Sequence, residues 1–302
     1  MTPQTAVNHY SPLRYPGGKG QLAGFFKKLL RGNGLCGGQY AEPYAGGAGV
    51  GLALLMTEHT SHIHLNDSSF PLYCFWRSVI ESPEDFCRRV VDTPVTPRVW
   101  QEQKRLLARP GDRDYIDIGF AFFFLNRTSR SGVLNGGMIG GKEQHGPWKI
   151  DARFGKPGLI RRIERISDYA GRISLYNMDA QRFLVEVVPV LPAKTLLYLD
   201  PPYFEKGQRL YDNSYGPGDH SAIAELLQTH VSHPWIVTYD DCEQIRALYA
   251  NRRGLAYVLN YSAQSHRVGR EVMFLADCLR LSEAAPGLSA LAPAGRARVP
   301  LL

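Results

Sequence analysis

The order of apolar and polar residues alternates short apolar runs with helix-like segments along most of the chain. Alternation of this kind predicts an α/β fold with a mostly parallel sheet. Residues 195–199 read TLLYL, a compact apolar run that predicts a buried central strand. The other expected strands are residues 38–44, 61–66, 172–177 and 235–239, with a terminal hairpin of residues 255–261 and 271–276.

Helix-like patterns occupy residues 50–56 and much of the middle of the chain. An aromatic helix-like segment begins at Phe70, and residues 118–125 are strongly apolar. Residues 159–170 have the spacing of an amphipathic helix, with apolar positions on one side and arginines on the other. The positions expected to be buried are Leu159, Ile163, Ile166 and Ala170.

These patterns predict three parts. Residues 1–69 and 168–281 are expected to form one discontinuous α/β domain, and residues 70–167 a largely helical domain inserted into it. Residues 282–302 are rich in Ala, Pro and Gly and lack periodicity, which predicts a flexible C-terminal tail.

Charge is concentrated in the inserted part. The chain has 35 Lys and Arg against 28 Asp and Glu, a net charge of +7. Residues 127–165 hold nine of these basic residues and three acidic ones, so they carry +6. Such a concentration favours a surface that faces an anion, and a solvated helix face beside a long loop is the alternative.

Several classes of protein do not fit this composition. No apolar run is long enough to cross a bilayer and no signal pattern opens the chain, which predicts a cytoplasmic protein. The five cysteines are odd in number and form no C-x-x-C pair, so a disulfide framework or zinc site is not expected. His62 and His64 share one face of an expected strand, but two ligands are too few for a metal site.

A glycine-rich turn, residues 41–49, links an expected strand to an expected helix. Glycines at such a turn let backbone amides approach a ligand closely. Asp67 ends the next strand about 20 residues on, where an acid would hold a ribose hydroxyl. The pattern indicates nucleoside binding, although it is not the strict G-x-G-x-x-G fingerprint, and a plain packing turn is the alternative.

Two further segments carry candidate chemistry. Lys19 follows two glycines without the spacing of a P-loop, and its ammonium group could pair with a carboxylate of a small ligand. Asp200-Pro201-Pro202-Tyr203 follows the strand of residues 195–199, at the edge where α/β sheets place ligands.

The second of these segments suits an exocyclic amine of a nucleobase. The Asp200 carboxylate and a backbone carbonyl could accept both N–H hydrogens, which would expose the nitrogen lone pair to an electrophilic methyl group. Tyr203 offers a ring face to a base removed from the duplex. Catalysis of this kind needs positioning and electrostatics rather than a metal or a covalent nucleophile.

Taken together, the chain resembles the Dam-like family of DNA adenine-N6 methyltransferases, the D12 class of alpha type. The matching segments read YPGGK (15–19), EPYAGG (42–47), LND (65–67), FLNR (124–127) with Gly132, YNMDAQRF (176–183) and LDPPY (199–203). They span the chain from Leu13 to about Leu279. Two departures are Tyr44, where relatives usually have Phe, and Ala48, where they often have a third glycine.

The resemblance implies a Rossmann-like fold with a mostly parallel seven-stranded sheet, one strand of it antiparallel, and an inserted target-recognition domain. It implies transfer of a methyl group from S-adenosylmethionine to N6 of a flipped-out adenine in double-stranded DNA. The target sequence, a restriction partner and a homodimer are left open by the sequence.

The resemblance also implies site residues. Cofactor binding would involve Tyr15, Lys19, Glu42, Pro43, Tyr44, Gly46, Asp67, Asp179 and Asp200. Catalysis would involve Asp200, Pro201, Pro202 and Tyr203. DNA contacts would come from Asn126, Arg127, Arg130, Ser131, Val133, Asn135, Lys142, Lys149 and Arg267. In this set, Arg130, Ser131, Val133 and Asn135 would read bases and the other basic residues would hold phosphates.

Alternatives differ at a few positions. Cytosine-N4 methyltransferases share the geometry but usually carry Ser in place of Asp200, and enzymes that methylate RNA or protein glutamine generally carry Asn. A non-catalytic DNA-binding module on a methyltransferase fold would not need Lys19, Asp67, Asp200 and Tyr203 together. A nucleotide-dependent oxidoreductase fits the glycine spacing poorly.

Overall fold

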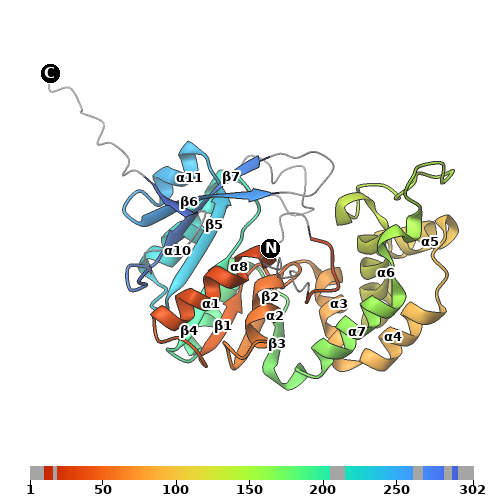
Figure 1. Cartoon of the computed structure of the whole chain (residues 1–302), viewed down its shortest axis with the longest axis horizontal. Helices are drawn as coiled ribbons and strands as arrows, with labels where there is room; N and C mark the ends of the chain where they lie inside the picture. The colour runs from red at the N-terminus through yellow and green to blue at the C-terminus, as the bar shows by residue number, and fades with distance from the viewer. Residues whose placement is uncertain (1–9, 16–18, 205–214, 261–267, 282–287, 292–302) are drawn as a thin grey trace, which may run out of the picture. The chain divides into compact units, whose positions relative to one another are not determined.

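The computed structural model describes residues 10–15, 19–204, 215–260, 268–281 and 288–291 (Figure 1). The chain divides into two compact units, residues 1–180 and 181–302. In the described residues no helix is long and apolar enough to span a bilayer.

The first unit contains three parallel strands in the order β3-β2-β1. They are β1 (Gln39–Glu42), β2 (His62–Asn66) and β3 (Ile173–Tyr176). Lys19–Leu22 form a 3-10 turn before α1 (Ala23–Gly32), and α2 (Gly49–Leu55) connects β1 to β2. Because the three strands run the same way, the loops that follow them emerge at one edge of the sheet.

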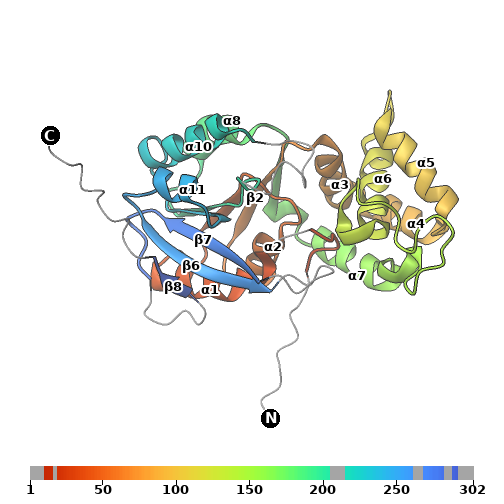
Figure 2. The same ribbon diagram turned by 90° about the horizontal axis from the view of Figure 1, so that it is seen from above.

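Five helices of the first unit form the inserted part, which Figures 1 and 2 show as one group of helices. They are α3 (Phe70–Glu81), α4 (Pro83–Asp92), α5 (Pro97–Ala108), α6 (Tyr115–Thr128) and α7 (Lys156–Ser167). The expectation of a largely helical insert is confirmed. The amphipathic helix ends at Ser167, so Ala170 lies beyond it, while Leu159, Ile163 and Ile166 are buried as expected.

Helix α6 is the centre of this group. A Cβ atom at its Gly119 would lie 2.6 Å from the carbonyl oxygen of Cys74, so only glycine lets α6 and α3 approach this closely. Phe75 of α3 stacks on Phe123 of α6 with ring centroids 5.6 Å apart, and both are fully buried. Burying each ring stabilises the fold by roughly 1.5–3 kcal/mol. Residues 118–125 are all apolar because this part of α6 is buried on every side.

The second unit contains strands in the order β4-β5-β7-β6-β8. They are β4 (Thr195–Leu199), β5 (Trp235–Asp240), β6 (Arg253–Asn260), β7 (Val268–Leu275) and β8 (Leu288–Ala290). Its helices are α8 (Ala180–Glu186), which begins at the last residue of the first unit, α10 (Pro217–Thr229) and α11 (Glu243–Leu248). Strands β4 and β5 are parallel, and β7 is antiparallel to both β5 and β6.

The strands confirm the expected fold class, an α/β Rossmann-like fold with a mostly parallel sheet. Three parallel strands lie in the first unit, and two parallel strands followed by an antiparallel pair lie in the second. One strand was not expected. The short β8 lies inside residues 282–302, predicted to be a flexible tail, and pairs with β6 (Figure 2). Its Leu288 lies opposite Tyr257 in the register.

The unit of residues 1–180 holds the helical insert together with β1, β2 and β3, while the domain boundaries stay a prediction. Hydrogen bonds link the insert to distant segments of this unit. The Trp76 indole of α3 donates to the carbonyl of Gly46 over 3.1 Å, and the Arg14 amide donates to the Asn126 side chain of α6 over 2.8 Å.

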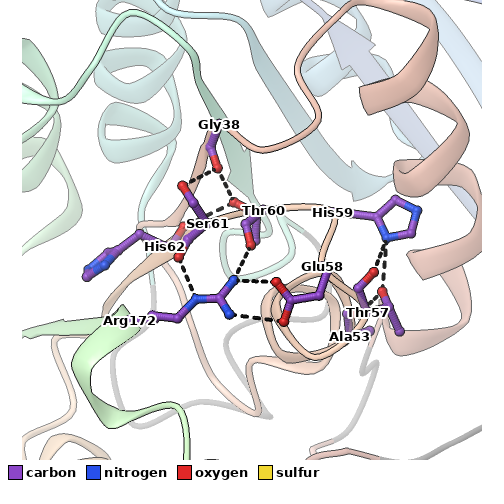
Figure 3. Close-up of polar contacts among 9 residues, drawn as sticks. All are labelled: Gly38, Ala53, Thr57, Glu58, His59, Thr60, Ser61, His62 and Arg172. Atoms are coloured by element: carbon purple, nitrogen blue, oxygen red, sulfur yellow. Dashed lines mark hydrogen bonds and ion pairs between the residues drawn. The ribbon is translucent and has the colours of Figure 1, made fainter.

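An ion pair fixes the amino ends of β2 and β3 (Figure 3). Arg172 binds both carboxylate oxygens of Glu58 at 3.0 Å and also donates to the carbonyl oxygens of Thr60 and Ser61. The hydrogen bond from Arg172 lowers the pKa of Glu58 below its ordinary value. These contacts lie at the end of the strands opposite to the loops that carry the candidate site.

Candidate functional site

Asn66 ties together the loops at the carboxyl ends of the three strands in the first unit. Its buried side-chain amide donates to the carbonyls of Pro43 and Met178, at 2.9 and 3.0 Å, and accepts from the Met178 amide at 3.1 Å. The carbonyl of Asn66 accepts from Ala45. Loops after β1 and β3 are thus held by one residue at the end of β2. The sequence indicates this role only by a polar residue at the end of an apolar strand.

Asp67, the next residue, lies against the glycine-rich turn. Its two carboxylate oxygens accept hydrogen bonds from the backbone amides of Gly46 and Ser69, both at 3.0 Å. Burial raises the pKa of Asp67 above its ordinary value, although these two hydrogen bonds act in the opposite direction. A carboxylate has about four lone-pair positions, so the group retains capacity to accept hydroxyl hydrogens of a nucleoside.

Tyr15 lies over the glycine turn. Gly46 has φ +46°, and a Cβ atom there would lie 2.8 Å from the Tyr15 ring. At Gly47 a Cβ atom would lie 3.2 Å from the Cβ of Tyr15. Glycine is therefore required at position 46 by both the tyrosine and the turn, whereas at position 47 the contact with Tyr15 is only tight. Ala48, the departure from the family pattern, has φ +48°, a left-handed conformation that glycine adopts at no steric cost.

The other expected cofactor residues have different environments. The Glu42 carboxylate is buried and accepts hydrogen bonds from Tyr40 at 2.8 Å and from the Gly51 amide of α2 at 3.1 Å. It therefore anchors the start of α2. Lys19 is buried, Pro43 is buried, Tyr44 is half-buried and Asp179 is exposed.

The second unit holds the strand-end turn Asp200–Tyr203. Thr238 on β5 donates to Oδ1 of Asp200 at 2.8 Å, and the hydroxyl of Tyr198 lies 3.0 Å from that of Thr238. The amide of Phe204 donates to Oδ1 of Asp240, the last residue of β5, at 2.9 Å. Strand β5 thus positions both ends of the turn.

A buried acid of β7 holds the tyrosine of this turn. The Tyr203 hydroxyl donates to Oε1 of Glu271 at 2.5 Å, and the Tyr257 hydroxyl donates to Oε2 at 2.6 Å. Glu271 is 1% exposed. Burial and nearby charged groups raise the pKa of Tyr257 well above its ordinary value. Sequence analysis did not identify Glu271, whose only signal is a single acid in the apolar run of β7.

In the expected recognition segment, the side chains differ in exposure. Arg130, Asn135, Lys142 and Lys149 are exposed, and Ser131 and Val133 are half-buried. Asn126 is 1% exposed, with its amide hydrogen-bonded to the backbone of Arg14 and Gly132. This burial contradicts a direct DNA contact for Asn126. Arg267 lies outside the described residues.

Four arginines of the first unit lie close together and are called the arginine group: Arg14, Arg127, Arg153 and Arg162. Arg127 donates to the carbonyls of Arg153 and Pro12, Arg162 donates to Ser11, and Arg14 donates to Ser129. Within the described ranges none of the four forms an ion pair with a carboxylate.

This environment destabilises the positive charge of Arg127. Burial, followed by repulsion from Arg14, Arg162 and Arg153, lowers the pKa of Arg127 to about 9. A bound anion would relieve that repulsion, and a phosphate group matches the fork of a guanidinium. Trp148 lies beside the group, 66% exposed, with the Arg153 guanidinium 5.7 Å from its ring centroid. The sequence signal for Trp148 is a tryptophan in a basic, glycine-rich segment.

The paired histidines have a structural environment. His62 contacts Ser174, and His64 contacts Gln39 and Tyr176, through their ring nitrogens. Burial and the adjacent His62 lower the pKa of His64 to about 4. Among the residues that the structure describes, no group of three or more His, Cys, Asp or Glu is placed to hold a metal ion.

Residues 15–105 match the family model of the D12 class N6 adenine-specific DNA methyltransferases. Over these residues the match supports the predicted family. This D12 class match covers Tyr15, the glycine turn and Asp67, and it ends before Asp200. The chemistry of the D12 class is methyl transfer, with a methyl donor of the S-adenosylmethionine type.

Comparison with solved structures found remote likenesses. The rRNA methyltransferase aviRa from Streptomyces viridochromogenes is 12% identical, with a TM-score of 0.37, over 90% of this chain and 89% of that one. Another structure of it is 11% identical, with a TM-score of 0.35, over 86% and 85%. A conserved hypothetical protein from Streptococcus pyogenes is 9% identical, with a TM-score of 0.32, over 82% and 90%. No curated protein matches the chain.

Proposed function

We propose that the chain transfers a methyl group from S-adenosylmethionine to N6 of adenine in double-stranded DNA at a specific target sequence. The family match supports the D12 class. The observation that carries the chemistry is that neighbouring side chains fix the strand-end turn Asp200–Tyr203. Thr238 orients the carboxylate of Asp200 and Glu271 orients the ring of Tyr203.

In this proposal Asp200 accepts one hydrogen of the adenine amine, and a backbone carbonyl of the Asp200–Tyr203 turn accepts the other. Withdrawing both hydrogens from the ring plane makes the nitrogen lone pair available to the methyl carbon; as the N–C bond forms, the bond between that methyl and sulfur would break, S-adenosylhomocysteine would leave, and one amine proton would pass to the Asp200 carboxylate. The flipped-out adenine stacks on Tyr203. When bound, S-adenosylmethionine supplies a sulfonium methyl that is already activated, so the chain contributes positioning and electrostatics.

The residues of the first unit fit the cofactor's nucleoside portion. Asp67 provides acceptors beside the glycine turn, and Tyr15 covers that turn with its ring. We assign the ribose hydroxyls to Asp67 and the methionine end to Lys19. Asp179 is exposed after β3, where the adenine of the cofactor would be contacted. Glu42 acts through α2, because its carboxylate is bound to Gly51 of that helix.

The DNA side of the proposal rests on the arginine group. Four guanidinium groups without a carboxylate partner in the described residues suit the phosphates of a duplex. Exposed Arg130 and Asn135 are proposed to reach base edges, and exposed Lys142 and Lys149 to contact the backbone. A homodimer is not needed for any of these roles.

Analysis of nucleosides from DNA methylated by the chain tests the proposal. N6-methyladenine is expected with wild-type protein and should be absent with the Asp200→Ala variant. N4-methylcytosine would instead favour the cytosine rival. Absence of any methylated nucleoside, from protein that binds both S-adenosylhomocysteine and DNA, would favour the non-catalytic module. Sequencing that maps the methylated positions then gives the target site.

A further inference from the structure

A reciprocal pair of hydrogen bonds joins two segments that are 112 positions apart in the sequence. The Arg14 amide donates to Oδ1 of Asn126, and Nδ2 of Asn126 donates to the Arg14 carbonyl, both at 2.8 Å. The same Nδ2 also donates to the Gly132 carbonyl at 2.9 Å. Both amide hydrogens of Asn126 are thus used. We call Asn126 and the backbone of Arg14 and Gly132 the Asn126 clasp.

One side of the clasp leads to the glycine turn. Arg14 directly precedes Tyr15, whose ring covers Gly46 and Gly47. Gly46 in turn donates to Asp67. A ligand that fixes Tyr15 and the glycine turn therefore restricts the backbone of Arg14 as well.

The other side leads to the recognition turn, residues 130–137. Gly132 has φ +77°, and a Cβ atom there would lie 2.2 Å from the Arg14 carbonyl oxygen. Ser131 beside it has φ +56°. This turn presents the exposed Arg130. The backbone of Arg14 and the recognition turn are therefore in direct contact.

We propose that the Asn126 clasp couples occupancy of the cofactor turn to the conformation of the recognition turn, with Asn126 and Gly132 as positioning residues for DNA recognition. The inference rests on the proposed function. By linkage, a ligand at either turn raises affinity at the other by the same factor, and such factors are about 5- to 150-fold in proteins. Asn126 has no contact with DNA in this scheme.

The test measures the dissociation constant of S-adenosylhomocysteine by calorimetry, alone and with saturating plasmid DNA that the wild type methylates. The ratio of the two constants is the coupling factor. For the wild type we expect a factor of at least about 5. Asn126→Asp keeps the acceptor and the size but loses both donors, and the factor should fall to about 1.

A pair of glycine variants separates coupling from general damage. Gly132→Ala places a methyl group against Arg14, whereas a Cβ atom at Gly137, which has φ +73° in the same turn, would meet no atom within 4 Å. Both substitutions strain a left-handed residue, but only Gly132→Ala displaces the clasp. Gly132→Ala should therefore remove the coupling and Gly137→Ala should retain it. Thermal melting verifies that each variant is folded.

The outcomes are distinguishable. A wild type that binds both ligands with a factor of 1, or an Asn126→Asp variant that keeps the wild-type factor, overturns the clasp and leaves the proposed function intact. An equal loss of coupling in the Gly132→Ala and Gly137→Ala variants also overturns the proposed role of the clasp. A wild type that binds neither S-adenosylhomocysteine nor DNA overturns the proposed function, and the clasp with it.

Discussion

Tyr203 and Glu271 are 68 positions apart in the sequence and form a hydrogen bond of 2.5 Å in a buried environment. The carboxylate is shared with Tyr257, so one acid sets the orientation of the tyrosine that the proposed mechanism places against the target base. Hydrogen bonds to charged groups contribute about 1.5–3 kcal/mol.

Glu271→Gln should lower kcat about tenfold or more, because a neutral amide has one acceptor oxygen for two hydroxyl donors. Steady-state methylation assays measure the effect. Tyr257→Phe is the matched control, since it removes the other hydrogen bond to Glu271 and leaves Tyr203 bound. If Tyr257→Phe reduced kcat more than Glu271→Gln, the role assigned to Glu271 would be wrong.

The orientation of Asp200 gives a graded prediction. Asp200→Asn should abolish methyl transfer, with a loss of at least about 100-fold, because an amide N–H would face the amine in place of an acceptor. Thr238→Val removes the hydrogen bond to Oδ1 together with the contact to the Tyr198 hydroxyl, and it should reduce kcat by about tenfold. Single-turnover methylation measures both. Near-normal activity of Asp200→Asn would refute the mechanism.

Asp67 predicts how cofactor binding depends on pH. Its pKa is raised above the ordinary value, so the carboxyl group becomes protonated at a higher pH than an exposed Asp does. The protonated form accepts fewer hydrogen bonds, and affinity for S-adenosylhomocysteine should therefore fall as pH is lowered toward that pKa. Titrations between mildly acidic and neutral pH measure this. The Asp67→Asn variant should bind S-adenosylhomocysteine more weakly, and its affinity should not change with pH. If the affinity of the variant still fell with pH as it does in the wild type, another group would be responsible for the pH dependence.

The arginine group predicts the salt dependence of DNA binding. Arg153→Ala should weaken binding at low salt and reduce the slope of log K against log salt concentration by about 1. Arg88, an exposed arginine of α4 paired with Asp85, provides the control variant Arg88→Ala. Fluorescence anisotropy at several salt concentrations distinguishes the two. Equal slopes for Arg153→Ala and Arg88→Ala would place the phosphates on another surface.

The pair of Arg172 and Glu58 predicts a change in stability without a change in chemistry. Arg172→Lys loses the two-point contact with Glu58 and the donors to Thr60 and Ser61. The melting temperature should fall while kcat is unchanged, because these contacts lie at the amino ends of the strands. Glu58 has a lowered pKa, so its contribution is present at neutral pH and is lost as pH falls through that pKa. If kcat fell in Arg172→Lys protein that is fully folded, the ion pair would affect catalysis as well as stability, and the prediction would be wrong.

Local patterns predicted the strands well where burial is continuous. Residues 195–199 form β4 as expected, because all five side chains are buried. The glycine turn and Asp67 were also predictable, since their spacing reflects contacts between neighbouring segments. The sequence-based role of Asn126 was wrong because the burial of its amide depends on Arg14, which local patterns do not reveal. Glu271 was missed for a similar reason, since its partners are set by the register of β7.

The recognition turn has a consequence for how target preference can change. An antiparallel bridge joins Ser129 to Met138, and the Arg130 amide donates to the Gly137 carbonyl at 2.9 Å, so the ends of the turn meet. A loop closed in this way tolerates new lengths and side chains between its ends at little entropic cost. We expect residues 133–135 to accept substitution, provided that Gly132 keeps its contact with Arg14 and that Gly136 is retained, because a Cβ atom there would lie 2.7 Å from the Arg130 carbonyl oxygen.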